Sequence, residues 1–174
     1  MRNMRFISVK EKYSLQSEHL YESSFPPEER RDWNKMKQIP LEKGFCFYAV
    51  EQDGDFVGII SLWEFDEFVY AEHFAVREDM RNKGLGTDIL QKVLRKYDKP
   101  VVLEIEPPVS STAKRREEFY KRNGFFLYDD YYFQPPYDDN SSGTELKIMS
   151  SRHSLEFYKI KNTLYKHVYQ VKNI

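Results

Sequence analysis

The chain has 174 residues, 40% of them hydrophobic and 16% aromatic, which is enough for one sizeable core and short for two. Its 27 basic and 28 acidic residues leave a formal charge of -1, which argues against the broad phosphate contacts that nucleic-acid binding requires. With Cys46 as the one cysteine, an intramolecular disulfide is excluded, and no structural zinc site or other metal site is expected.

The composition also favours a cytoplasmic protein. The N-terminal residues contain no apolar run of the length that a secretory signal needs, and no stretch reaches the ~18 consecutive apolar residues of a membrane span. A lone cysteine suits a reducing compartment. We therefore expect a soluble, cytoplasmic protein with neither a nucleic-acid nor a membrane partner.

The first half of the chain is expected to form a strand, two helices and a three-stranded antiparallel meander. Weak alternation indicates the first strand, and prolines bound the helices. The Asp53-Gly54 pair is a strong hairpin signal between two aromatic, β-branched runs. The expected ranges, in chain order, are residues 4–9, 13–24, 27–38, 45–51, 56–65 and 68–76.

After the meander, the spacing of apolar residues changes from that of strands to that of a helix. Apolar residues at helical spacing predict a helix that begins near Gly84 and ends before Asp98, and a short apolar run predicts the next strand. The later elements alternate between helix and strand around one long loop at 134–143. Their expected ranges are a strand at 101–105, a helix at 111–123, strands near 125–133 and 144–149, and a terminal helix at 154–171. This order predicts an α+β domain with one mixed sheet covered by helices on both faces.

The junction between the third meander strand and the following helix is a candidate anion site. The motif Arg81-x-x-Gly84-x-Gly86 opens the helix, where glycine permits close approach of a ligand to the backbone and the first-turn N–H groups face negative charge. Arg77, Arg81 and Lys83 concentrate positive charge at this turn. The alternative is a glycine-rich helix start with solvated charges.

Two other phosphate-binding motifs do not fit this junction. A dinucleotide fingerprint requires a third glycine where the chain has Ile89. A P-loop requires Gly-Lys-Ser/Thr where the chain has Gly86-Thr87-Asp88.

Three segments together resemble a known family. They are Glu72-His73-Phe74-Ala75-Val76, Arg81-Asn82-Lys83-Gly84-Leu85-Gly86 and Glu118-Phe119-Tyr120-Lys121-Arg122-Asn123-Gly124-Phe125. Their order and context resemble the GNAT superfamily of acetyl-CoA-dependent N-acetyltransferases over about residues 1–150. The resemblance implies a GNAT-like, mainly antiparallel central sheet, to which this chain adds a C-terminal helix. It also implies acetyl-CoA as cosubstrate.

The resemblance further implies which segment of the chain contacts each part of the cofactor. The backbone of the strand that ends at Val76 would pair with the pantetheine arm, and the helix start would hold the pyrophosphate. The residues expected to bind acetyl-CoA are Phe74, Ala75, Val76, Arg81, Asn82, Lys83, Gly84, Leu85, Gly86, Thr87 and Tyr120. The basic run 114–116 is interpreted as a solvated helix face, although it could also approach the nucleotide.

Acetyl transfer to an amine needs a base for the amine and an acid for the departing thiolate. Tyr120 occupies a position where the family motif often carries a tyrosine that protonates the sulfur, although its ring could instead pack under the cofactor. Strand alternation places Glu72 with Phe74 and opposite His73, so Glu72 is the preferred general base. Glu104 on the next predicted strand is the alternative base. His73 is interpreted as a core histidine, and Cys46, in an aromatic run, as a small hydrophobe.

The acceptor is predicted to be a small-molecule primary amine, and the acidic loops named below favour a cationic one. In this fold the acceptor site is walled by the loop before the second helix and the loop before the last strand. Those loops carry Glu28, Glu29, Asp138 and Asp139, with Tyr131, Tyr132 and Tyr137 close by. Two other functions remain open: a non-catalytic acyl-CoA-binding module, and a transferase that acts on a protein or peptide. The acyl-chain preference also stays open.

The terminal helix extends beyond the family pattern. We assign residues 1–150 to the acetyltransferase domain and residues 151–174 to a helical extension. The aromatic face of the extension must bury against something, either its own domain or a second copy. The protein is accordingly expected to be a monomer or a homodimer.

Overall fold

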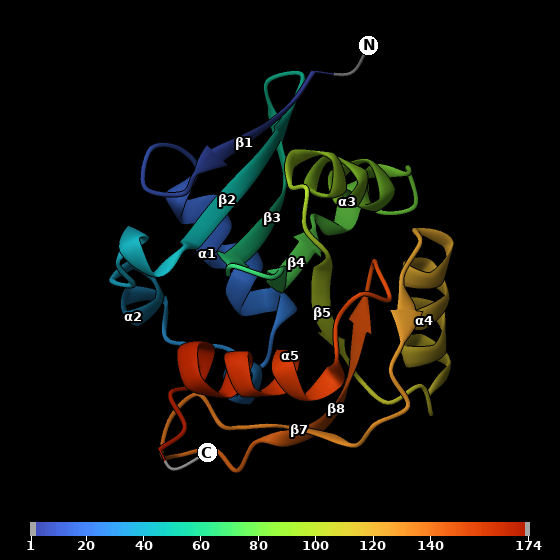
Figure 1. Cartoon of the computed structure of the whole chain (residues 1–174). Helices are drawn as coiled ribbons and strands as arrows, with labels where there is room; N and C mark the ends of the chain where they lie inside the picture. The colour runs from blue at the N-terminus through green and yellow to red at the C-terminus, as the bar shows by residue number, and fades with distance from the viewer. Residues whose placement is uncertain (1–2, 173–174) are drawn as a thin grey trace.

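Eight strands form one sheet in the computed structural model, which describes residues 3–172 (Figure 1). The sheet order is β1-β2-β3-β4-β5-β8-β6, with β7 paired to β8. Between the described residues, only β4 and β5 pair in parallel. The strands are β1 Met4–Ser8, β2 Phe45–Gln52, β3 Asp55–Glu64, β4 Val69–Val76, β5 Val101–Ile105, β6 Phe126–Leu127, β7 Tyr132–Gln134 and β8 Thr144–Ser150.

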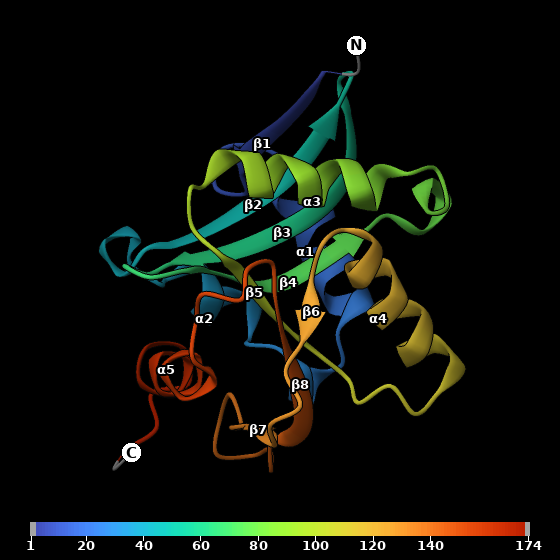
Figure 2. The ribbon, with the colours of Figure 1, turned by 45° about the vertical axis from the view of Figure 1, so that its right-hand side comes forward.

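Helices cover both faces of this sheet, which confirms the predicted α+β architecture (Figure 2). The helices are α1 Ser14–Ser24, α2 Trp33–Lys37, α3 Leu85–Lys96, α4 Ser111–Arg122 and α5 Phe157–Thr163, the last continued by a π-helical turn, Leu164–Val168. One core cluster joins the sheet to α1, α2 and the C-terminal helix, and a second cluster joins it to α3 and α4. The predicted C-terminal helix is present.

Two predicted elements are wrong in extent. The helix expected over 27–38 is a 3₁₀ turn, Pro27–Glu29, followed by the short α2. The Asp32 carboxylate caps α2 by accepting from the N–H groups of Asn34 and Lys35, and Arg30 before it is extended. The strand expected over 125–133 is divided into β6 and β7, and the Lys147 ammonium donates to two carbonyls of the intervening loop.

The parallel strands β4 and β5 separate partway along their length. They pair only over Val69–Val101, Tyr70–Val102 and Ala71–Leu103. Beyond these pairs β4 stays on β3, while β5 stays on β8 as far as Ile105. The end of β4 therefore has no strand neighbour on the side of the gap, where α3 and α4 approach the sheet, and the Val76 carbonyl accepts from Arg81 Nε at 3.1 Å.

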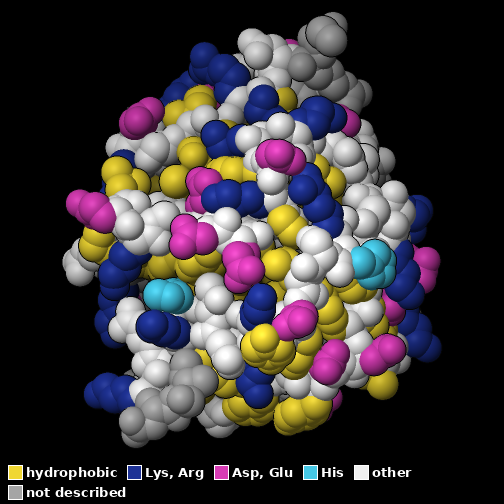
Figure 3. All heavy atoms as spheres, viewed as in Figure 1, with side chains coloured by type: hydrophobic (Ala, Val, Ile, Leu, Met, Phe, Trp, Pro, Cys, Tyr) yellow, Lys and Arg dark blue, Asp and Glu magenta, His cyan; other side chains and the backbone are white. Residues whose placement is uncertain are grey.

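Acidic and basic side chains are interspersed over the face that carries the C-terminal helix (Figure 3). This mixture agrees with the near-zero formal charge of the chain and shows no single-sign surface there. No helix among residues 3–172 is long and apolar enough to cross a bilayer.

Candidate active site

The turn from β4 into α3 forms a cradle around the helix N-terminus. Gly84 precedes the helix with φ 81°, and Asn82 also has a positive φ of 61°. Glycine adopts this left-handed conformation without the steric cost that other residues meet. Gly86 lies against α4, because a Cβ there would stand 3.2 Å from the Phe119 ring. The first-turn N–H groups of α3 consequently open toward a space between the two helices.

That space, the cradle cavity, has a volume of about 640 Å³. Most of the residues predicted to bind a cofactor line it: Phe74, Val76, Arg81, Asn82, Gly84, Leu85, Gly86, Thr87 and Tyr120. Ala75 lines a neighbouring cavity instead. Lys83 lines neither cavity, and its ammonium contacts the Met80 sulfur at 3.6 Å.

Cationic residues of α4 complete the rim of the cradle cavity. Arg115, Arg116 and Arg122 line it together with Arg81. The interpretation of the run 114–116 as a solvated helix face missed this for Arg115 and Arg116, and Arg122 was not considered. These arginines could have been predicted from their helical spacing relative to Tyr120. Positions 115, 116, 119 and 122 lie on neighbouring parts of one helix surface.

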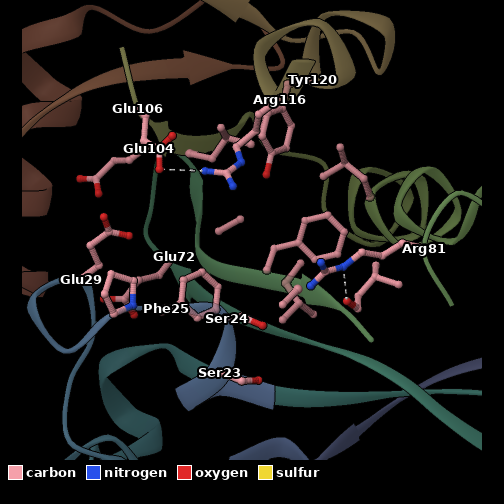
Figure 4. A pocket seen from close by; sticks show the side chains of 18 residues that line it. Ser23, Ser24, Phe25, Glu29, Glu72, Arg81, Glu104, Glu106, Arg116 and Tyr120 are labelled. Atoms are coloured by element: carbon pink, nitrogen blue, oxygen red, sulfur yellow. Dashed lines mark hydrogen bonds and ion pairs between the residues drawn. The ribbon is translucent and has the colours of Figure 1, made fainter. Parts of the chain in front are cut away.

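A second cavity, the glutamate cavity, continues from the cradle cavity toward β5. It has a volume of about 610 Å³ and shares Phe74, Val76, Arg81, Arg116 and Tyr120 with the first. Figure 4 shows its polar lining, with Arg81 toward one end and a group of glutamates at the other. Those glutamates are Glu29, Glu72, Glu104 and Glu106.

Tyr120 stands where the two cavities meet. Its residue is 9% exposed and its hydroxyl points into the glutamate cavity (Figure 4). Among residues 3–172 no hydrogen bond to this hydroxyl is formed. Burial raises the pKa of Tyr120 to about 12, against the opposing charge of Arg116, so the phenol stays protonated near neutrality.

Glu72 belongs to a buried charged network. Its carboxylate, 1% exposed, pairs with the Arg31 guanidinium and accepts from Trp63 Nε1 at 2.9 Å and from the Tyr137 hydroxyl at 3.1 Å. Burial disfavours the charged form, but the Arg31 charge and these donors outweigh it and lower the pKa of Glu72. The guanidinium also lies 4.6 Å from the centre of the Tyr137 ring.

The expectation that Glu72 shares a strand face with Phe74 is wrong. The pairing of β3 with β4 changes register between Ser61–His73 and Leu62–Ala71, which leaves Glu72 as the extra residue of a β-bulge. Phe74 packs toward α3 and α4, whereas Glu72 meets Arg31 on the opposite face. The bulge thus places Glu72 and His73 on the same side of the sheet.

His73 is buried at the base of α1. It is 4% exposed, its ring makes edge contacts with Tyr21 and Phe25, and Nε2 lies 3.0 Å from the Glu29 carbonyl. Burial lowers the pKa of His73, so the ring is neutral and donates Nε2–H to that carbonyl. The histidine fixes the backbone of the loop that contributes Glu29 to the glutamate cavity.

Glu104 sits in a ring of neutral donors. Its carboxyl accepts from the Tyr132 hydroxyl, from Gln134 Nε2 at 2.6 Å and from the Tyr169 hydroxyl at 2.8 Å. Burial raises the pKa of Glu104 above its usual range, although these hydrogen bonds act in the opposite direction. No cation pairs with Glu104 among the described residues. The carboxyl therefore titrates closer to neutrality than an exposed glutamate does.

The remaining predicted acceptor residues are scattered. Glu29 lines the glutamate cavity, whereas Asp138 lines a separate cavity of about 230 Å³ beside Arg31. Glu28 and Asp139 line neither of these cavities. Tyr137 reaches Glu72 and Tyr132 reaches Glu104. No group of three or more histidine, cysteine or carboxylate side chains that could hold a metal ion occurs within residues 3–172.

An unpaired strand edge beside a helix N-terminus with a cationic rim defines a class of site. It suits a ligand that joins an extended amide arm to a diphosphate, as coenzyme A does. The chain belongs to the acetyltransferase (GNAT) family, whose model matches residues 9–125. The predicted family is thereby confirmed, and members of this family use acetyl-CoA.

Solved structures and one curated relative agree with this assignment. A chain from Bacteroides thetaiotaomicron, provisionally described as a GNAT-family acetyltransferase, is 34% identical, with a TM-score of 0.88 and coverage of 98% of this chain and 99% of that one. A GNAT acetyltransferase from Elizabethkingia anophelis with acetyl-CoA bound is 16% identical and shares the fold, with a TM-score of 0.56 over 86% and 96% of the two chains.

The curated relative is YjbC of Bacillus subtilis (strain 168), whose acetyltransferase name is provisional. It is 32% identical over 83 residues, which are 48% of this chain and 41% of that protein. The match thus spans about two fifths of the length of the curated relative.

Proposed function

We propose that the protein transfers an acetyl group from acetyl-CoA to a primary amine, directly and within a ternary complex. The observation that carries the proposal is the Tyr120 hydroxyl. The Tyr120 residue is 9% exposed, its hydroxyl lies at the junction of the two cavities, and this hydroxyl has no hydrogen-bond partner among residues 3–172. The hydroxyl is open to the cavity, so a ligand atom at the junction would accept its hydrogen bond.

The residues of the cradle cavity fit acetyl-CoA. The amides from Gly84 to Thr87 would hold the pyrophosphate, and Arg81, Arg115 and Arg122 would neutralise phosphate charge. The unpaired edge of β4 after Ala71 would hydrogen-bond the pantetheine arm. Acetyl-CoA supplies a thioester whose C–S bond breaks as a C–N bond forms with the amine.

Tyr120 and Glu104 are proposed to move the two protons of this reaction. Tyr120 donates its phenolic proton to the departing sulfur, and the Glu104 carboxylate accepts the proton that the amine loses. Exchange with solvent then restores both groups. The charge of Arg116, which favours ionised Tyr120, assists the donation.

We place the general base at Glu104 rather than at Glu72. A base is most effective when its pKa lies near the working pH, and the two carboxyls shift in opposite directions. Glu72 is held as an anion by Arg31, which lowers its pKa and makes it the weaker base of the two. Its proposed role is to anchor Arg31, and through Arg31 the carbonyl of Val168 at 3.0 Å.

Release of free thiol from acetyl-CoA in the presence of a primary-amine panel tests the proposal. We expect Tyr120→Phe to lower kcat by about 10²- to 10⁴-fold, with the affinity for acetyl-CoA changed by less than about threefold. Calorimetric titration with acetyl-CoA supplies the binding control.

Other outcomes assign the protein differently. Binding of acetyl-CoA without turnover of any amine or peptide would favour the non-catalytic acyl-CoA-binding module. Turnover of peptides alone would make the acceptor a protein. Absence of acetyl-CoA binding would contradict the transferase.

A further inference from the structure

The acidic end of the glutamate cavity is unevenly charged. Glu72 is neutralised by Arg31, and Glu104 is held by neutral donors. Besides Glu104, the proposed base, the carboxylates of this end without a buried counterion are Glu29, from the loop between α1 and α2, and Glu106, directly after β5. Both residues, with Arg116, also line a small adjoining cavity of about 80 Å³.

These two carboxylates are poorly compensated. Glu106 pairs with Arg116 at 3.3 Å, and both side chains of that pair are nearly half exposed, at 43% and 47%. No cation pairs with the Glu29 side chain among residues 3–172. Burial raises the pKa of Glu29, and repulsion from Glu106 and Glu28 adds to the rise, while Arg116 opposes it. One arginine therefore faces two carboxylates.

Two residues that line the same cavity carry a hydroxyl without a hydrogen-bond partner among residues 3–172. The Tyr120 hydroxyl, on a residue that is 9% exposed, points into it (Figure 4). The buried Ser24 Oγ, from another lining residue, also lacks a partner. Phe25 and Pro26 add an apolar wall beside Glu29. An acceptor in this cavity would thus meet the Tyr120 hydroxyl at one end and two carboxylates at the other end. Between them lies an apolar surface that suits an aliphatic chain.

We propose that Glu29 and Glu106 bind a second ammonium group of the acceptor, so that aliphatic diamines are the preferred acceptor class of this site. The assignment rests on the proposed acetyl transfer. The reacting nitrogen lies beside Glu104 and Tyr120, and the distal ammonium lies between Glu29 and Glu106. His73 holds the Glu29 backbone in place through Nε2. A monoamine of equal length fills the same space but leaves the two carboxylates unpaired, which costs binding energy in a partly desolvated site.

Steady-state kinetics with diaminobutane and butylamine, at saturating acetyl-CoA, test this assignment. We expect kcat/KM of the natural protein to be about 10- to 100-fold higher for the diamine. Glu29→Gln and Glu106→Gln should each lower the ratio of the diamine kcat/KM to the butylamine kcat/KM by about tenfold. Glu28→Gln is the matched control, because Glu28 adjoins Glu29 in sequence but lines neither cavity.

The outcomes separate this inference from the function on which it rests. Equal turnover of both amines, unchanged by either substitution, would overturn the diamine assignment alone. Failure to acetylate either amine while another primary amine of the panel is acetylated would also overturn the diamine assignment alone. Failure with every amine of the panel, with acetyl-CoA bound, would overturn the proposed transfer and the assignment together. Circular dichroism and acetyl-CoA affinity verify that each variant is folded, and the partly exposed Glu106 provides a variant with little influence on folding.

Discussion

Glu72 and Glu104 line one cavity, yet their neighbours differ in charge. Arg31 stabilises the anion of Glu72, whereas tyrosine and glutamine side chains solvate Glu104 without a compensating cation. Environments that push two carboxyl pKa values apart commonly assign the two groups different roles. The position of Glu72 in the β-bulge and the position of Glu104 opposite Ile148 in β8 create that difference.

Glu104→Gln should lower kcat by about 10²- to 10³-fold, because an amide cannot accept the amine proton. The dependence of activity on pH also has a defined direction. The base works only when ionised, so activity of the natural enzyme falls as pH drops through the raised pKa of Glu104, at a pH above the usual glutamate range. The variant should lack that acid limb.

Glu72→Gln is the contrasting variant. It leaves buried Arg31 without its anion, so the free energy of unfolding should fall by about 3–5 kcal/mol while the acid limb of the remaining activity persists. Urea unfolding and rate measurements from the same preparations distinguish the two variants. An acid limb that vanishes in Glu72→Gln and survives in Glu104→Gln would reverse the assignment.

At the scale of elements, Glu51 joins β2 to three parts of the N-terminal region. Its carboxylate lies 2.7 Å from the Arg5 guanidinium of β1, 2.5 Å from the Lys12 ammonium and 2.6 Å from the Tyr13 hydroxyl before α1. These donors, Lys12 foremost, lower the pKa of Glu51 to about 2. β1 is an edge strand, so this clamp holds α1 against the sheet where backbone pairing is one-sided.

The clamp should make stability depend on pH in a defined way. A carboxyl whose pKa is lowered by folding stabilises the folded state above its unfolded pKa, and this contribution disappears as pH falls through about 2. Glu51→Gln should therefore be less stable than the natural protein at pH ~6, with the difference shrinking as pH approaches 2. Urea unfolding at several pH values measures it. Glu67→Gln, at an exposed pair 3.8 Å from Lys159, should show no such trend.

At the scale of the whole molecule, the C-terminal helix contributes to the main core. Ile160 and Leu164 are 0% exposed, and both pack in the cluster that contains Tyr21, Trp33 and Tyr70. The Tyr169 hydroxyl also reaches Glu104 in the candidate site. We therefore expect residues 151–172 to unfold together with the rest of the domain.

Leu164→Ala should lower the free energy of unfolding of the whole chain by about 2–5 kcal/mol, because it leaves a cavity in the shared core. Tyr158→Ala, at a residue 56% exposed on the same helix, should change it by less than about 0.5 kcal/mol. Denaturant unfolding followed by tryptophan fluorescence reports on Trp33 and Trp63 in the domain. An unchanged domain transition in Leu164→Ala would show that the extension unfolds by itself.

The local sequence was sufficient to predict the turn and helix start that form the cradle. Residues 81–87 lie within one turn and one helix start, so glycine placement and helix polarity specify their arrangement without distant partners. The hairpin at Asp53-Gly54 and the strand Val101–Ile105 were likewise predictable from short-range pattern, and the family follows from the order of such segments.

Tertiary structure decided which charges the site uses. The bulge at Glu72 breaks the alternation that placed this residue beside Phe74, and Arg31, which neutralises it, lies 41 positions earlier. Tyr132 and Tyr169, which solvate Glu104, lie 28 and 65 positions from it. Such partners leave no local periodicity, because pKa depends on burial and on charges brought together by folding. The sequence by itself determined the fold and the anion cradle, and only the folded chain distinguished the anchoring glutamate from the proposed base.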